Sequence, residues 1–363
     1  MRRQPERRVR LADVARLAET SEATASRALK DDPRIGEGTR AAVRAAAHKL
    51  GYVPNAAARS LRAKRTHILG LLLDDLADPV HGKVAAGFEE AAASRGYAVF
   101  MMTGLHDPDR EERALRTFLE HRADGVVLAS CVSEPSDVFR YVSQERVVFV
   151  QPDYPSLADG AEPPDRGVLR TDDVGGFTAA VDHLVERGYR RIAYVGPGVG
   201  ASDAVRRAAA AEALERLGLG PLRSIDSGPN GWRDPSIAAE QLANDPPDAV
   251  LCYDDKLAMS LLDALRSTRL DVPADIGFMG FDGIPAARQA RPRVTTVDVP
   301  SVEIGRRAVE MLVDSTREGQ PRPSEVMPVR LIVGETTPPV RTKSGSDRAG
   351  EAPPVAARGE ARR

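Results

Sequence analysis

Short apolar runs alternate with longer amphipathic stretches from residue 68 onward. Runs that are almost continuously apolar are typical of parallel β-strands that helices cover on both faces. The pattern therefore predicts a doubly wound parallel α/β structure. The predicted strands are ILGLLLDD (68–75), YAVFMMT (97–103), GVVLAS (125–130), RVVFVQPD (146–153), GVLRTDD (167–173), RRIAYVGPG (190–198), AVLCYDD (249–255) and DIGFMGFD (275–282). Helices are predicted near 80–95, 108–121, 173–187, 203–217 and 256–267.

These βα units form two successive sets, which predicts two similar lobes within residues 67–338. We expect lobe 1 at about 67–166 and 300–320, and lobe 2 at about 167–299 and 321–338. Open parallel sheets bind ligands beyond the C-terminal ends of their strands, so the polar residues there are candidates for a small-molecule site. Each acid among them could instead cap the next helix. These residues are Asp74, Asp75, Thr103, Ser130, Gln151, Asp172, Asp254 and Asp282.

The N-terminal residues have a helical period instead. Apolar residues from Leu11 to Ala18 share one helix face, and Ser21 is a plausible N-cap for a second helix over 22–29. A third helix follows in GTRAAVRAAAHKLGY and ends at Gly51. Two short helices joined by a tight turn match a helix-turn-helix, whose second helix enters the major groove of DNA.

The distribution of charge supports a nucleic-acid partner for this N-terminal part. The 363-residue chain has a net charge of −2, but residues 1–65 hold 16 Lys and Arg against 7 Asp and Glu. A basic segment on an acidic body indicates a polyanionic partner, because phosphate neutralisation drives sequence-independent DNA binding.

Composition limits the other possibilities. No apolar run is long enough to span a membrane and no secretory signal follows the basic start, so we expect a cytoplasmic protein. Cys131 and Cys252 are isolated in apolar runs and are predicted to be buried thiols. VGPGVG (195–200) lacks the spacing of a dinucleotide-binding loop, which leaves a Rossmann-type oxidoreductase as a remote alternative. We expect no catalytic residues, cofactor or metal.

At this point the chain resembles the LacI/GalR family of bacterial transcription regulators. The resemblance covers about residues 9–338 and is carried by VRLADVARLAETSEATASRAL (9–29), the segment from RIGEGTRAAVRAAAHKLGY to LGLLLDDLADP (34–79), HLVERGYRRIAYVG (183–196), DAVLCYDDKLAM (248–259), the segment from DVPADIGFMGFDG to VPSVEIG (271–305) and VRLIVGETTPP (329–339). It implies a helix-turn-helix domain at 9–54 after a basic arm at 1–8, and a hinge helix and linker at 55–66. The core would be a periplasmic-binding-protein-like pair of lobes, followed by a disordered tail at 339–363.

The resemblance also implies which residues contact DNA. The second helix of the motif would read the operator, and Leu61 of PNAAARSLR (54–62) would insert into the minor groove. Ordinary helix packing is the alternative role for Leu61. Glu22 could accept a hydrogen bond from cytosine or could act through the helix dipole, and we weigh these equally. The DNA-binding candidates are Arg10, Ser21, Glu22, Ala23, Thr24, Ser26, Arg27, Asn55, Ala58, Arg59, Leu61 and Arg62.

Motif by motif, the resemblance implies an effector site in the cleft. Its candidate residues are Asp75, Val80, His81, Gln151, Arg206, Asp254 and Asp282. Asp255 is a further candidate, but it is the acid most at risk of merely capping a helix. His81 could contact a ligand or lie on the surface.

The chain departs from the family pattern at several positions. Glu19 replaces a turn glycine, Ala25 replaces a larger valine, and Asp254 stands where asparagine is common. Val80 and His81 stand where aromatic residues are usual, which weakens the expectation of a stacked sugar or nucleoside.

Together these observations predict a ligand-responsive repressor that binds a pseudo-palindromic operator as a homodimer. The effector is expected to be sugar-like or another polar metabolite, and no membrane partner is expected. The alternative is a small-molecule-binding protein with degraded DNA reading, which Glu19, Glu22 and Ala25 suggest.

Overall fold

The computed structural model describes residues 9–53, 65–228, 230–231 and 233–340. The chain forms two compact units, Met1–His67 and Ile68–Arg363. The predicted basic arm, the PNAAARSLR hinge helix and the tail beyond residue 340 lie outside the described residues. Among the helices that the structure does describe, none combines the length and apolarity needed to cross a bilayer.

The first unit is a three-helix head that confirms the predicted helix-turn-helix. Its helices are α1 (Leu11–Leu17), α2 (Glu22–Ala28) and α3 (Glu37–Leu50). The Ser21 hydroxyl caps α2 by accepting a hydrogen bond from the Thr24 backbone N–H at 3.1 Å. Gly51 ends α3 in the left-handed conformation, with φ of 62°. The small core of the head consists of Val14, Ala15, Ala25, Ala28, Val43, Ala46 and Ala47.

The turn between α1 and α2 is strained because Glu19 has φ of 49°. A side chain with a Cβ atom disfavours this region, which glycine adopts freely. Beside the turn, a hollow of about 370 Å³ is lined mainly by Ala18, which follows α1, and by alanines of α3, together with Leu17, Glu19 and Lys49. The head therefore has a thin core and a strained turn at the entry to α2.

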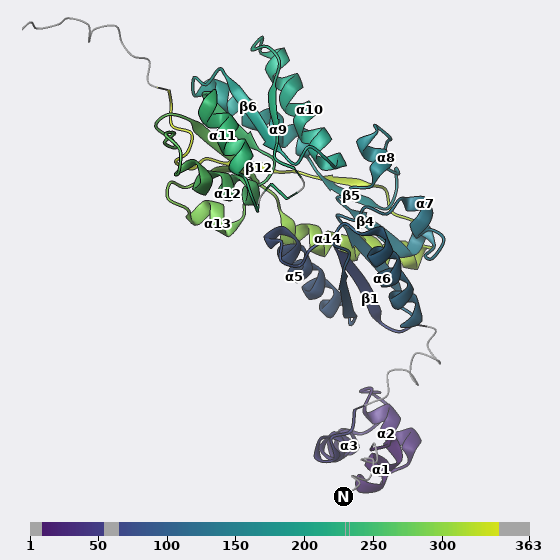
Figure 1. The fold of residues 1–363 in the computed structure, drawn as a ribbon. Helices are drawn as coiled ribbons and strands as arrows, with labels where there is room; N and C mark the ends of the chain where they lie inside the picture. The colour runs from purple at the N-terminus through teal and green to yellow at the C-terminus, as the bar shows by residue number, and fades with distance from the viewer. Residues whose placement is uncertain (1–8, 54–64, 229, 232, 341–363) are drawn as a thin grey trace, which may run out of the picture. The chain divides into compact units, whose positions relative to one another are not determined.

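The second unit contains two six-stranded sheets, which confirms the predicted two-lobe α/β class (Figure 1). The first sheet has the order β11-β5-β4-β3-β1-β2 and the second has the order β12-β10-β9-β8-β6-β7. All pairs are parallel except β10–β12. The strands of the first sheet are β1 (Ile68–Leu73), β2 (Ala98–Thr103), β3 (Gly125–Ala129), β4 (Val147–Val150), β5 (Val168–Thr171) and β11 (Glu325–Met327). Those of the second are β6 (Ile192–Gly196), β7 (Arg223–Asp226), β8 (Ala249–Cys252), β9 (Gly277–Asp282), β10 (Thr295–Asp298) and β12 (Arg330–Ile332).

Helices cover both faces of each sheet, as the continuously apolar strands require. The helices of lobe 1 are α5 (Pro79–Ser94), α6 (Pro108–Glu120), α7 (Pro135–Val138), the 3₁₀ turn η1 (Gln144–Arg146), α8 (Pro155–Ala158) and α14 (Ser301–Glu318). The helices of lobe 2 are α9 (Asp173–Glu186), α10 (Ala201–Arg216), α11 (Ser236–Asn244), α12 (Asp255–Leu265) and α13 (Pro285–Gln289). The five helices that the sequence predicts are therefore α5, α6, α9, α10 and α12.

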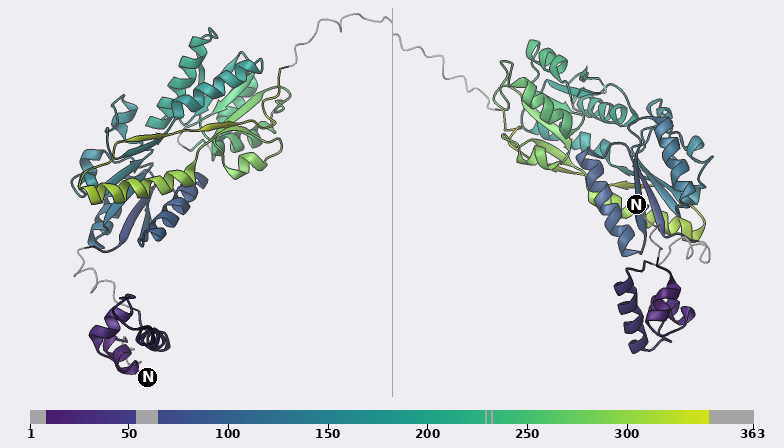
Figure 2. Two further views of the ribbon diagram at one scale, coloured as in Figure 1. Left: turned by 180° about the vertical axis from the view of Figure 1, so that it is seen from behind. Right: turned by 60° about the horizontal axis from the view of Figure 1, so that its bottom comes forward.

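Helix α14 returns to lobe 1 and packs against α5, as the views in Figure 2 show. The helices approach closely because each contributes a glycine to the contact. A Cβ atom on Gly87 would lie 1.9 Å from the Val302 carbonyl oxygen, and one on Gly305 would lie 2.1 Å from the Val84 carbonyl oxygen. These two glycines hold the returning segment against the first helix of the lobe.

The predicted lobe boundaries at 167 and 321 are wrong. β5 pairs with β4, and β11 pairs with β5, so both strands belong to lobe 1. The chain therefore leaves lobe 1 after β5, returns between β10 and α14, and leaves again between β11 and β12. The sequence did not reveal this because β11 is only three residues long and has no apolar run.

We predict that Glu19→Gly stabilises the head by about 1 kcal/mol, because glycine relieves the strained φ. Gly51→Ala should destabilise the head by a similar amount, because alanine would have to adopt the left-handed backbone conformation at the C-cap of α3. Hydrogen exchange of the α1–α3 amides in the full-length chain measures both changes. Slower exchange in Gly51→Ala than in the parent protein would contradict this account of the backbone.

Candidate functional site

A cavity with a volume of about 880 Å³ lies at the C-terminal ends of the strands and is lined by residues of both lobes. It contains every residue predicted for the effector site. These are Asp75, Val80, His81, Gln151, Arg206, Asp254 and Asp282. The sequence reasoning did not select several other lining residues. They include His106, Asp153, Tyr253 and Lys256.

Strained backbone is concentrated around this cavity. Non-glycine residues with positive φ are uncommon and often mark functional sites. Within the described residues nine have this conformation, and five of the nine line the cavity. These five are Leu105, His106, Ser130, Gln151 and Asp282. The loops after the strands are therefore held in conformations that direct polar groups into the cavity.

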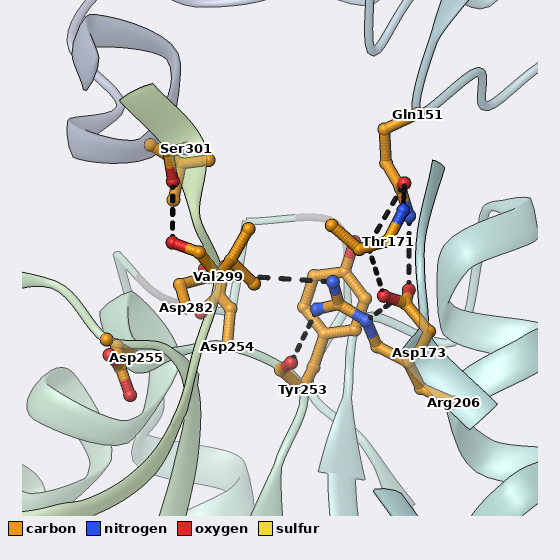
Figure 3. A network of polar contacts seen from close by, with 12 residues as sticks. Gln151, Thr171, Asp173, Arg206, Tyr253, Asp254, Asp255, Asp282, Val299 and Ser301 are labelled. Carbon is orange, nitrogen blue, oxygen red and sulfur yellow. Dashed lines mark hydrogen bonds and ion pairs between the residues drawn. The ribbon is translucent and has the colours of Figure 1, made fainter. Parts of the chain in front are cut away.

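Arg206 of α10 is the centre of a buried polar network (Figure 3). Its Nε donates to Asp173 Oδ2 at 2.9 Å and one terminal nitrogen donates to the Tyr253 carbonyl oxygen at 2.8 Å. Its guanidinium also lies over the rings of Tyr253 and Phe281, 4.6 and 4.1 Å from their centroids. Burial alone would lower the pKa of Arg206, but the neighbouring carboxylates of Asp173 and Asp282 raise it. The guanidinium is therefore firmly charged.

The same network joins the two lobes. Gln151 follows β4 and Thr171 ends β5, so both belong to lobe 1, whereas Asp173 begins α9 of lobe 2. Gln151 Nε2 donates to Asp173 Oδ2 at 3.2 Å, and Thr171 Oγ1 donates to Asp173 Oδ1 at 2.5 Å. Gln151 Oε1 accepts hydrogen bonds from the backbone and hydroxyl of Thr171. Asp173 was missed because the sequence suggested Asp172, which instead caps α9 through the Gly175 N–H.

The adjacent acids Asp254 and Asp255 have different roles. Asp254 caps α12 by accepting a hydrogen bond from the Leu257 N–H at 2.7 Å, and it also lines the cavity. Asp255 is buried away from the cavity and accepts hydrogen bonds from Thr296 Oγ1 and the Ile284 N–H. The proposed effector role of Asp255 has no support in this geometry, because its carboxylate ties α12 to the strand and loop beside it.

Ion pairs also lie at the wall of the cavity. Lys256 of lobe 2 donates a hydrogen bond to Asp78, the N-cap of α5 in lobe 1. Burial would lower the pKa of Lys256, but Asp254 and Asp78 raise it. His106 Nδ1 lies 2.7 Å from Asp74 Oδ1, and this contact raises the pKa of His106.

His81 is buried rather than on the surface. Its Nδ1 lies 2.8 Å from the Asp75 carbonyl oxygen, and its Nε2 lies 3.1 Å from Ser130 Oγ. Both ring nitrogens therefore have partners across the loops that follow β1 and β3. This arrangement fixes the orientation of the ring at the cavity wall.

Both cysteines are free thiols in the interior of the core. Cys131 and Cys252 are buried, and burial raises the pKa of both thiols. Within the described ranges, no three His, Cys, Asp or Glu side chains are placed to hold a metal ion.

On the head, the predicted DNA-contacting residues surround the start of α2. Ser21, Glu22, Ala23 and Arg27 are exposed, whereas Thr24 and Ser26 are partly buried. The hydroxyls of Ser21 and Thr24 lie 2.9 Å apart. Arg10 is exposed at the start of α1. The predicted hinge residues Asn55, Ala58, Arg59, Leu61 and Arg62 lie outside the described residues.

A helix-turn-helix head joined to a two-lobed ligand-binding core defines a class of protein, the ligand-responsive DNA-binding regulators. Comparison with known families and proteins supports this assignment. Residues 10–55 match the lacI family of bacterial regulatory proteins, and residues 181–337 match the periplasmic binding protein-like domain.

The chain is 31% identical over 312 residues to the ribose operon repressor of Escherichia coli, covering 84% of this chain and 92% of that protein. It is 30% identical over 306 residues to the transcriptional regulator GalR of Escherichia coli, covering 83% and 87%. The chain therefore belongs to the LacI family of transcription regulators, and its relatives are regulators rather than enzymes.

Two solved structures share the fold. The lac repressor dimer bound to operator and the anti-inducer ONPF is similar with a TM-score of 0.79 and 24% identity, covering 92% of this chain and all of that chain. The complex of the regulator CelR with cellobiose has a TM-score of 0.65 and 27% identity, covering 91% of this chain and all of that chain.

Asp255 gives a test of the buried polar structure beside the cleft. Burial raises the pKa of Asp255 to about 7, so the folded protein holds a proton that the unfolded chain has already released above about pH 4. The contribution of this bound proton to the free energy of unfolding is fully present below about pH 4 and is lost as the pH rises through about 7. We predict that Asp255→Asn removes on the order of 2 to 3 kcal/mol of the stability loss between pH 5 and pH 8. Urea unfolding at both pH values measures it, and equal pH dependence in the two proteins would contradict the assignment.

Proposed function

We propose that the protein represses transcription in the cytoplasm as a homodimer on a pseudo-palindromic operator and responds to a small polar molecule in the cleft. The observation that carries the proposal is the polar cavity between two lobes in a chain that also contains a helix-turn-helix head. Twofold symmetry of the dimer would be matched by two operator half-sites. Its role requires no catalytic residue and no cofactor.

The ligand would act by changing the relation between the lobes. Gln151 and Thr171 of lobe 1 hold Asp173 of lobe 2, and Asp173 holds Arg206 at the cavity wall. A ligand that contacts Arg206 or Asp282 would compete with or reinforce these bonds. It would therefore favour one lobe arrangement, which is the condition for shifting an equilibrium by binding.

The chemistry of the cavity supports a polar effector, and a sugar-like metabolite is one such class. Two of the similar proteins are described by a sugar, namely the ribose operon repressor and the CelR regulator in its complex with cellobiose. The effector would contact Asp75, Val80, His81, Gln151, Arg206, Asp254 and Asp282. Fluorescence anisotropy with labelled operator tests the regulatory role. Operator affinity should change when a ligand saturates the cavity, and unchanged affinity with every ligand that binds the core would contradict the proposal.

For DNA recognition, we assign the major-groove contacts to the start of α2 and the minor-groove contact to Leu61. The residues proposed to contact DNA in the head are Arg10, Ser21, Glu22, Ala23, Thr24, Ser26 and Arg27. In the hinge they are Asn55, Ala58, Arg59, Leu61 and Arg62.

Glu22 is proposed to read a base rather than to stabilise α2. Ser21 already supplies the cap of that helix, and Glu22 is exposed at its first position. A carboxylate in the major groove can accept a hydrogen bond from cytosine N4. This argument favours the base-reading role over the helix-dipole role that the sequence alone left equally open.

We predict that Glu22→Ala relaxes discrimination at one cytosine of each half-site by about 1 to 3 kcal/mol. Selection of bound sequences from a random DNA pool by the full-length protein measures this preference. Glu37→Ala is the matched control because it removes an acid from the first turn of α3 and should leave the selected motif unchanged. Tighter binding of all sequences by Glu22→Ala, with no change at any base, would instead support a purely electrostatic role.

A further inference from the structure

The cavity contains more acidic than basic side chains. Seven aspartates line it, and they are Asp74, Asp75, Asp78, Asp153, Asp159, Asp254 and Asp282. The basic residues along the same described lining are Arg206, Arg233 and Lys256, together with His81 and His106. Carboxylates that leave water need a positive charge or hydrogen-bond donors, so this excess bears directly on the ligand.

The central cations are already engaged with the protein. Arg206 donates its short hydrogen bonds to Asp173, which is not a lining residue, and to the Tyr253 carbonyl oxygen. Lys256 is bonded to Asp78 and lies 3.8 Å from Asp254. Within the described residues, the carboxylates of Asp254 and Asp282 therefore have only long ion-pair contacts, at 3.8 Å to Lys256 and 4.0 Å to Arg206.

Asp282 is the most exceptional of these acids. It is only 8% exposed, and its one ion pair is a long contact of 4.0 Å from Oδ1 to a terminal nitrogen of Arg206. Among the residues that the structure describes, none donates a hydrogen bond to its carboxylate. Its backbone is held at φ of 108° at the end of β9, which places the carboxylate at the cavity wall. The carboxylate is thus an acceptor at the cavity wall that a donor group of a ligand could reach.

The electrostatics agree with this geometry. Burial raises the pKa of Asp282 well above its usual range, Arg206 lowers it, and the carboxylates of Asp254, Asp255 and Asp78 raise it further. Burial also raises the pKa of Asp254, and Lys256 offsets only part of this effect. The raised pKa values favour the protonated forms of these acids, and a bound cation would stabilise their charged forms more than a neutral hydroxyl group would.

We propose that the effector of this protein is a small molecule that carries a protonated amine, and that Asp282 and Asp254 bind its ammonium group. Figure 3 shows both side chains beside the Arg206 network. This inference rests on the proposed role of the cavity as the effector site. Arg206 would then donate hydrogen bonds to oxygen atoms of the same ligand, so that the amine end and the hydroxyl end of the ligand contact different members of the network.

Isothermal titration calorimetry of the full-length protein with matched pairs of probes tests the proposal. The pairs are glucosamine with glucose, galactosamine with galactose, and putrescine with 1,4-butanediol, in each of which ammonium replaces hydroxyl. The amine of at least one pair should bind at least about tenfold more tightly than its neutral partner, as expected for a charge-assisted hydrogen bond in place of a neutral one. Tighter binding of the neutral member, or binding of no amine, would overturn the proposal.

Two variants connect this preference to the named residues. Asp282→Asn keeps the shape of the side chain and removes its charge, so the amine should lose at least about tenfold in affinity while the neutral partner changes little. Asp263→Asn removes a charge from the exposed face of α12, where the side chain is 79% exposed, and should leave both affinities unchanged. Asp254→Asn supplies the same test if Asp282→Asn does not fold. An amine affinity that survives both cavity substitutions would contradict the assignment.

Operator binding by the same samples separates this inference from the proposed function. If an amine binds through Asp282 but does not change operator affinity, the amine site stands and the effector role fails. If a neutral ligand changes operator affinity and the amines do not bind, the effector role stands and the amine site fails.

Discussion

The buried guanidinium of Arg206 is the constraint around which the ligand-binding core is organised. A charge at this depth is tolerated only when it is paired and hydrogen-bonded. Asp173 and the Tyr253 carbonyl satisfy it, and two aromatic rings pack against its faces. Asp173 is held in turn by Gln151 and Thr171 from the other lobe. The need to pair the buried charge of Arg206 therefore links both lobes to the cavity.

This coupling gives a physical basis for regulation. The network lies where the chain passes from β5 into α9, and the ion pair of Lys256 with Asp78 joins the lobes at the cavity wall. A ligand that forms new bonds with Arg206 or Asp282 changes interactions that also hold the lobes together. Binding energy in the cavity is therefore available to alter the arrangement of the core, and through it the affinity for DNA.

The sequence predicted the elements and the cavity lining well because both follow from local patterns. Apolar runs located most strands, and most of the polar residues after them line the cavity because parallel strands end at one edge, although Thr103 and Asp172 do not line it. It did not predict Asp173 as the partner of Arg206, since adjacent acids in RTDD look alike until the start of α9 is known. It also misplaced β5 and β11, because strand pairing between distant segments leaves no local signal.

A double-mutant cycle on Arg206 and Asp173 tests the central claim most directly. Urea unfolding would compare the parent protein with Arg206→Met, Asp173→Asn and the double variant. We expect Arg206→Met to cost roughly 3 to 5 kcal/mol, because it leaves Asp173 buried and unpaired. The double variant should recover at least about 2 kcal/mol relative to the sum of the single changes. Additive effects within about 0.5 kcal/mol would show that this pair does not organise the core.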